Sequence, residues 1–220
     1  MQMNSNSTGI QAESTQMPSD LVMMSAIELS AAIRTRRVSC REVMVAYLDH
    51  IERINPKVNA IVSLVERDTL LGEANKADAE LSAGRVRGWM HGMPHAVKDL
   101  AVTKGICTTM GSPLFADWIP SEDAIFVERL RQSGAILIGK TNTPEWGLGS
   151  QCYNPVFGTT LNAYDQTRTA GGSSGGAAVA LAMRMVPVAD GSDFAGSLRN
   201  PAGWNNVYGF RPSSGRVRRP

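Results

Sequence analysis

The chain has 220 residues, which is enough for one sizeable domain but short for two. With 43% hydrophobic and 19% charged residues, its composition is that of a soluble globular protein and excludes a disordered chain. The formal net charge of +2 provides no strong field to attract nucleic acid or an anionic membrane, so neither is expected as a partner.

Targeting and redox signals are weak along the chain. The first 20 residues lack both the basic residues and the apolar stretch of a secretory signal, and no run approaches the roughly 18 apolar residues of a membrane span. Cys40, Cys107 and Cys152 are scattered and match neither a disulfide framework nor a metal-ligand spacing. A cytoplasmic protein is expected, with residues 1–19 as a flexible polar tail and residues 20–220 as the domain.

Two capping boxes predict the first helices. Ser25 with Glu28 and Ser39 with Glu42 have the S-x-x-E spacing in which the serine caps a helix and the glutamate reaches back to it. The second helix is expected to stop before Pro56. A third, ending near Gly84, is indicated by apolar residues at helical spacing: Leu70, Ala74, Ala77 and Leu81.

Strands and helices alternate in the rest of the chain. The pattern predicts strands at 93–97, 135–139 and 186–189, with helices at 121–133 and up to residue 183. Between the second strand and the last helix lies a glycine-rich loop region at 142–176. Strand, helix and strand in this order indicate an α/β fold with a mixed, largely parallel sheet flanked by helices.

Four glycines and two serines at 171–176 stand directly before an apolar helix. No lysine follows as a phosphate-binding loop requires, and the dinucleotide-binding spacing is absent. Gly172, Ser174 and Gly176 fit a nucleophile elbow, but that mechanism needs a histidine base, normally after the serine. The histidines all lie upstream, at positions 50, 91 and 95. A plain structural loop and a catalytic loop with another base both remain open.

Lysine is another possible base, because burial favours its neutral form. Lys98 follows an apolar segment in HGMPHAVKDLAV, although an ordinary lysine is the alternative. His91 and His95 flank Pro94 in this segment and are expected to be ordinary loop histidines. A further serine, Ser197, follows small residues that would let backbone N–H groups approach a substrate carbonyl.

These motifs, taken together and in order, resemble the amidase signature family. They are GMPHAVKD around Lys98, GAILIGKTNTPE at 134–145, NPVFGTT at 154–160, GGSSGG at 171–176 and GSDFAGSLRNPA at 191–202. The resemblance implies the amidase signature fold and a Ser-cisSer-Lys triad. Ser197 would be the acyl-enzyme nucleophile, Ser173 the bridging serine after a cis peptide bond from Gly172, and Lys98 the general base.

The resemblance also implies an oxyanion hole built from the N–H groups of Phe194, Ala195, Gly196 and Ser197, and it implies no metal or organic cofactor. Ala195 stands where the family pattern often has glycine. Asp193 and Arg199 flank this loop and are expected to pair. Gly147 and Leu148 match a region that often lines the acyl channel, with simple packing as the alternative.

The resemblance covers only the N-terminal half of a family member, so a fold incomplete at its C-terminus is expected. The implied function is hydrolysis of a carboxamide or an aryl or acyl amide. A glutaminase-type subunit of a tRNA-dependent amidotransferase and an inactive truncated remnant are the alternatives. The expected partners are a small amide substrate and either a second copy of the chain or the missing C-terminal half.

Overall fold

A computed structural model describes residues 19–217, so the tail expected at residues 1–19 lies, except for Ser19, outside the described residues. The elements in chain order are α1 (Asp20–Met23), α2 (Ala26–Arg34), α3 (Cys40–Val58), β1 (Ile61–Val62), α4 (Arg67–Ser82), β2 (Pro94–Lys98), η1 (Pro113–Phe115), α5 (Ile125–Gln132), β3 (Ile136–Thr141), η2 (Glu145–Gly147), β4 (Tyr153–Asn154), β5 (Gly158–Thr159), α6 (Gly175–Ala182) and α7 (Arg199–Trp204).

Both predicted capping boxes are confirmed. The backbone N–H of Ser25 donates to the Glu28 carboxylate at 2.8 Å, and Ser25 in turn accepts the Glu28 N–H, which opens α2. Ser39 and Glu42 open α3 in the same way. These pairs satisfy N–H groups that a helix leaves without internal partners at its start. The third predicted helix is confirmed as α4.

The expected end of α3 is wrong, because the helix continues through Pro56 to Val58. Proline removes one backbone donor, but the last turn is closed by the N–H of Asn59, which donates to the carbonyl of Asn55 at 2.7 Å. The Asn55 side chain then accepts the N–H of Ile61 at 2.8 Å and sets the path into β1. These local bonds outweigh the cost of the proline.

The main sheet is mixed, as expected, with the strand order β1-β3-β2. β2 and β3 are parallel with Lys98 opposite Thr141, whereas β1 runs antiparallel to β3. The strand predicted at 186–189 is wrong, since this segment is irregular. Pro187 lacks a backbone donor for a ladder, and the outer edge of β2 bonds instead to a side chain, that of Asp190.

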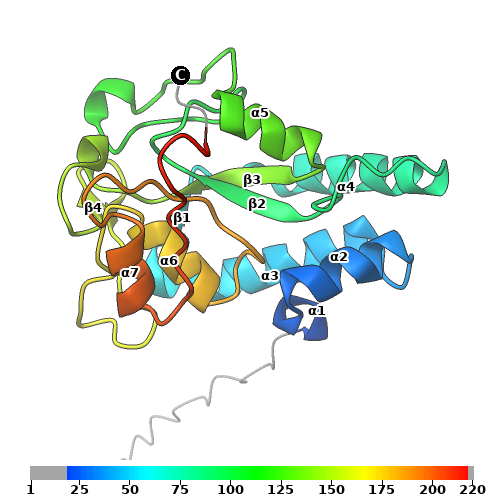
Figure 1. Ribbon diagram of the computed structural model, residues 1–220, viewed down its shortest axis with the longest axis horizontal. Coiled ribbons are helices and arrows are strands. Elements are labelled where there is room, and N and C mark those ends of the chain that lie inside the picture. The colour runs from blue at the N-terminus through cyan, green and yellow to red at the C-terminus, as the bar shows by residue number, and fades with distance from the viewer. Residues whose placement is uncertain (1–18, 218–220) are drawn as a thin grey trace, which may run out of the picture.

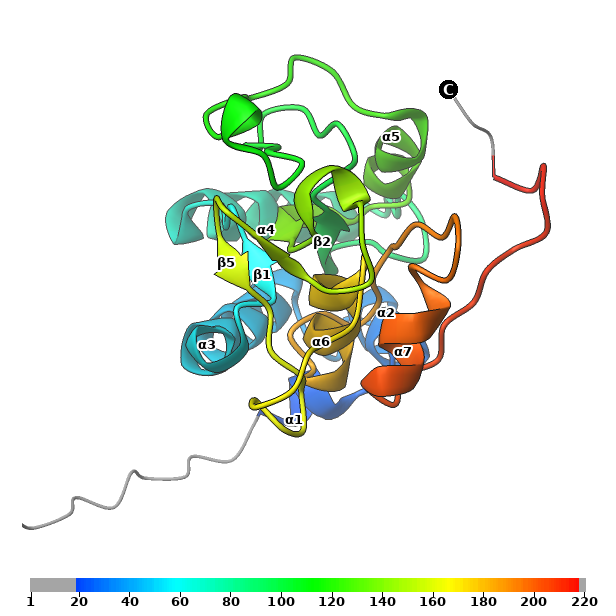
Figure 2. The same ribbon diagram turned by 90° about the vertical axis from the view of Figure 1, so that its left-hand side faces the viewer.

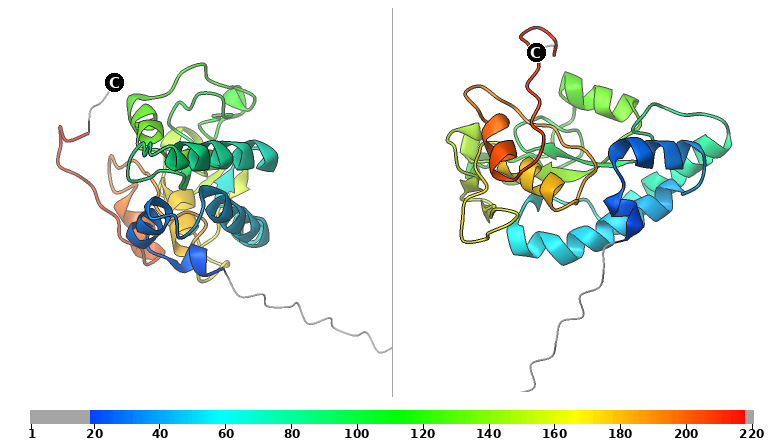
Figure 3. Two further views of the ribbon diagram at one scale, coloured as in Figure 1. Left: turned by 90° about the vertical axis from the view of Figure 1, so that its right-hand side faces the viewer. Right: turned by 60° about the horizontal axis from the view of Figure 1, so that its bottom comes forward.

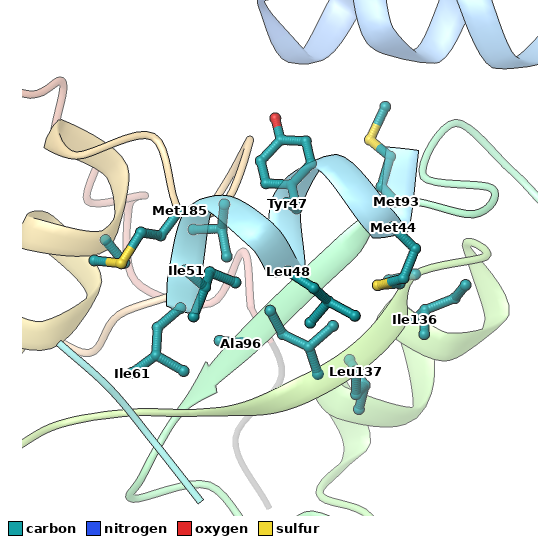
Figure 4. Close-up of a cluster of buried hydrophobic side chains, with 14 of the residues drawn as sticks. Met44, Tyr47, Leu48, Ile51, Ile61, Met93, Ala96, Ile136, Leu137 and Met185 are labelled. Carbon is teal, nitrogen blue, oxygen red and sulfur yellow. The ribbon is translucent and has the colours of Figure 1, made fainter. Parts of the chain in front are cut away.

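Helices cover both sides of this sheet. Figure 1 shows α5 on one side and α3 and α6 on the other, while α4 packs along α3 and β3. α5 begins at Ile125, four residues later than expected, because the preceding Ala124 N–H is bound to the carbonyl of Val102. In the core, Leu48 and Ile51 of α3 point toward β2 and β3 (Figure 4). Burial of these side chains holds α3 against the sheet.

The arrangement of α6 positions the candidate site. This helix packs on β2 and β3 and lies between α3 and α7 (Figure 2). Its N-terminus therefore meets the carboxyl end of β2, which is where α/β folds usually carry their sites. After α7, residues 207–217 continue as an irregular segment on the outside of the molecule (Figure 3). Within residues 19–217, no helix is long and apolar enough to cross a membrane.

Candidate active site

Lys98 is the last residue of β2, and its side chain is only 2% exposed. Its Nζ donates hydrogen bonds to three serine hydroxyls, those of Ser173 at 2.7 Å, Ser174 at 2.9 Å and Ser192 at 2.9 Å. An ammonium group has three N–H donors, so each donor has one serine hydroxyl as its acceptor. A neutral amine would instead accept from one hydroxyl, and that of Ser173 is nearest.

Burial lowers the pKa of Lys98 to about 8, against the opposing influence of Asp190, Cys152 and Asp193. The ammonium form is penalised because the strand end offers little water to solvate it. A lysine with a pKa near 8 is neutral in about a tenth of the molecules at pH 7, and this neutral form can accept a proton as a base.

The glycines at 171–176 let the loop into α6 approach other backbone segments closely. A methyl group on Gly172 would lie 2.9 Å from the backbone nitrogen of Gln151, and one on Gly176 would lie 2.3 Å from that of Asn142. No side chain fits at either contact. The Gly172–Ser173 peptide bond is cis, as the resemblance implies. These contacts hold Ser173 at the end of β2.

Ser197 is joined to the same loop by the backbone, because its carbonyl accepts the Ser174 N–H at 2.9 Å. It lies two residues before α7 begins at Arg199 and is partly buried. The structure thus brings the 191–198 segment to the Gly-Ser loop and Lys98. All three residues of the expected triad, Lys98, Ser173 and Ser197, come from segments that meet at this point.

Asp193 organises the turn around Ser197. Its carboxylate accepts the Gly196 N–H at 2.8 Å and pairs with Nε of Arg199 at 2.8 Å, which confirms the expected pairing. The Arg199 guanidinium holds the pKa of Asp193 well below its usual range. Of the four N–H groups expected to form an oxyanion hole, that of Gly196 therefore points to Asp193. Phe194 stands out from the turn and is 97% exposed.

A pocket of about 510 Å³ opens beside Lys98. Ser192 and Asp190 line it together with mostly apolar residues at 100–102 and 122–126. Gly147 and Leu148, the expected substrate-binding residues, are not part of this lining among the described residues. Gly147 packs against the Leu100 side chain, and Leu148 is 76% exposed.

A second buried lysine lies on the neighbouring strand. Nζ of Lys140 donates to the carbonyl of Ala101 at 2.6 Å and to Oγ1 of Thr103 at 2.7 Å, and lies 4.0 Å from the Asp99 carboxylate. Burial lowers its pKa to about 8 as well. No serine hydroxyl in the described chain bonds to it, so Lys140 holds the loop after β2 rather than facing the Gly-Ser loop.

Sequence reasoning missed several residues near Lys98. Ser192 gave a signal, since it belongs to the same motif as Ser197, but only the fold shows that its hydroxyl reaches Lys98.

His95 is not a loop residue as expected, because it lies in β2 and is buried. His91 does lie in a turn, and its Nε2 is 3.0 Å from the carbonyl of Ala77. All three cysteines are free.

Comparison with known proteins shows the family to which the chain belongs. A profile of the amidase family matches residues 42–220. The chain is 43% identical over 201 residues to a glutamyl-tRNA(Gln) amidotransferase subunit from Acidothermus cellulolyticus, covering 91% of this chain and 40% of that protein. The corresponding protein of the same name from Azoarcus sp. is 43% identical over 199 residues, with 90% and 40% covered.

Solved structures of amidases have a similar fold. A bacterial aryl acylamidase of the amidase signature enzymes superposes with a TM-score of 0.86 at 35% identity, over 90% of this chain and 41% of that one. A second structure, described as an amidase, gives a TM-score of 0.81 at 41% identity, over 89% and 44%. The chain belongs to the amidase family and has the amidase signature fold. It spans about two fifths of the length of these relatives.

Proposed function

We propose that this chain carries the reaction centre of an amide hydrolase. Neutral Lys98 takes the hydroxyl proton of Ser173 as Ser173 takes that of Ser197, and the Ser197 oxygen attacks the amide carbonyl. The backbone N–H groups of Phe194, Ala195 and Ser197 stabilise the oxyanion, since that of Gly196 is bonded to Asp193. The proton then passes to the leaving amine, and water hydrolyses the acyl-enzyme.

The observation that carries this proposal is the contact between Lys98 and three serine hydroxyls. A buried lysine is costly when it has no charged partner, and here its 2.7 Å bond runs to a neutral hydroxyl. These neutral partners indicate that Lys98 acts as a base and not as half of a structural ion pair. Lys140 in the same sheet differs, because its amino group lies 4.0 Å from the Asp99 carboxylate.

A glutaminase is a second candidate function, because relatives at 43% identity are named as glutamyl-tRNA(Gln) amidotransferase subunits. Both candidates use the same acyl-enzyme chemistry, so the substrate distinguishes them. Ammonia release from glutamine with no turnover of aryl amides would support the glutaminase. Turnover of aryl amides or simple carboxamides with no release from glutamine would support the amidase.

Fluorophosphonate labelling of the protein tests the proposal directly. The reagent should form a covalent adduct on Ser197, located by peptide mass spectrometry, because the relay makes that hydroxyl nucleophilic. Ser197→Ala should carry no adduct, while Ser213→Ala, which removes an exposed serine elsewhere, should label like the original chain. A folded sample that gains no adduct on Ser197 would show that this chain alone does not form a reactive centre.

The labelling rate should rise with pH. Only neutral Lys98 can accept a proton, and its pKa of about 8 means that the neutral fraction grows as pH increases through that value. Rates measured between about pH 6 and about pH 10 should increase and then level off, with a midpoint near 8. A flat profile would argue against lysine as the base.

A further inference from the structure

His95 and Asp190 form a partly buried pair next to Lys98. His95 lies three residues before Lys98 on β2, and its Nε2 is 3.1 Å from Oδ1 of Asp190. The side chains are 2% and 16% exposed. A carboxylate can only accept, so Nε2 carries the hydrogen and donates it. The other ring nitrogen, Nδ1, is buried and has no partner in the described chain, so Asp190 is the polar contact that fixes the ring.

The same carboxylate also binds the backbone of Lys98. The Lys98 N–H donates to both Oδ1 and Oδ2 of Asp190 at 3.2 Å. β2 is an edge strand of the sheet (Figure 1), so this N–H faces away from β3 and needs a partner outside the ladder. Asp190 therefore connects the irregular segment after α6 to the residue that carries the candidate base.

Charge around Lys98 is unevenly distributed. Among the groups that raise its pKa, Asp190 has the largest influence, ahead of Cys152 and Asp193. Asp190 also raises the pKa of Lys140 on the adjacent strand. The three serine hydroxyls that bond to the Lys98 amino group carry no charge. Asp190 is thus the main fixed negative charge that offsets the burial of this lysine.

A base is most effective when its pKa is close to the working pH, since a strongly lowered pKa leaves a neutral but weak base. We propose that Asp190, oriented by His95, is a positioning residue that holds the backbone of Lys98 at the strand end and stabilises its protonated form. This inference rests on the proposed function for its catalytic meaning. The electrostatic link between the two residues can be measured without any turnover.

The test is a titration of Lys98 by NMR. The chain has only five lysines, so ¹³Cε–¹⁵Nζ spectra of the labelled protein are simple, and Lys98→Arg assigns the signal. Asp190→Asn should move the Lys98 midpoint to lower pH by at least about 0.5 pH unit, because the amide keeps an acceptor for the backbone N–H but removes the charge. Asp190→Glu keeps the charge, so its Lys98 midpoint should lie close to that of the original chain.

Glu122→Gln is the matched control. Glu122 lines the same pocket, but it is not among the groups that shift the Lys98 pKa, so the midpoint should stay unchanged. If Asp190→Asn fails to fold by circular dichroism, Asp190→Ser carries the test, since its hydroxyl is also neutral and can accept a hydrogen bond. An unchanged midpoint in the neutral variants, or an equal shift in Asp190→Glu, would overturn the inference.

The titration is made in the Ser197→Ala background as well, where no acyl-enzyme can form. A shifted Lys98 midpoint with no fluorophosphonate adduct on Ser197 in the original chain would reject the proposed function and leave the Asp190 link in place. An adduct on Ser197 with an unmoved midpoint would reject the link alone.

Discussion

Lys98→Met is expected to slow fluorophosphonate labelling of Ser197 by about 10²–10⁴-fold, the usual contribution of a positioned general base. Methionine keeps a long side chain at the end of β2 but cannot accept a proton. The variant should remain folded, because removing a buried ammonium group also removes its desolvation penalty. Labelling rates from quenched time courses, together with thermal unfolding of the same samples, measure both effects.

Lys98→Arg separates proton transfer from charge. Arginine keeps a cation that can donate to the serine hydroxyls, but it stays protonated at every pH at which the protein is folded. Its labelling rate should therefore fall as far as that of Lys98→Met. A rate for Lys98→Arg close to that of the original chain would mean that a positive charge suffices at this position, and the proposed relay would be wrong.

Gly176→Ala is expected to have the largest effect on stability. A methyl group there would lie 2.3 Å from the backbone nitrogen of Asn142 and 2.7 Å from the carbonyl oxygen of Ala60, and neither backbone atom can turn aside as a flexible side chain could. α6 would have to move away from the ends of β1 and β3, taking Ser173 with it. Urea unfolding should show a loss of about 3 kcal/mol in the free energy of unfolding.

Gly72→Ala is the matched control for that substitution. Gly72 lies in the middle of α4, and an added methyl group would meet no atom within 4 Å. Alanine favours a helix over glycine, so this variant should gain about 0.5–1 kcal/mol. If Gly176→Ala proved as stable as the original chain, the close approach of α6 to the strand ends would not be needed for folding.

Much of the fold follows from local sequence. The capping boxes at Ser25 and Ser39 predict the starts of α2 and α3 because their hydrogen bonds join residues only three apart. The apolar segments that form β2 and β3 were also predictable from their length and composition. The continuation of α3 through Pro56 was not, since it depends on the hydrogen bonds that Asn55 accepts from Asn59 and Ile61. The irregular path at 186–189 was not predictable either, because the edge of β2 there bonds to the distant Asp190 side chain.

The candidate site was likewise predictable in part from the sequence. The order of the motifs around Lys98, the Gly-Ser loop and Ser197 was enough to suggest the family and the residues that matter. The resemblance of the motifs singled out Lys98, whereas the local pattern alone does not distinguish it from Lys140. Both lysines follow buried strand residues, and the fold shows that they differ in what surrounds their amino groups.

The amino-acid sequence by itself indicates the family motifs, most helix and strand positions and the candidate triad. Each of these depends on short motifs whose residues are close together along the chain. The fold was needed to show that Ser174 and Ser192 join Ser173 at Lys98, and that Asp190 and His95 stand behind it. These contacts join residues 75 to 95 positions apart. They depend on how α6 and the segment after it pack on the sheet, which no local pattern specifies.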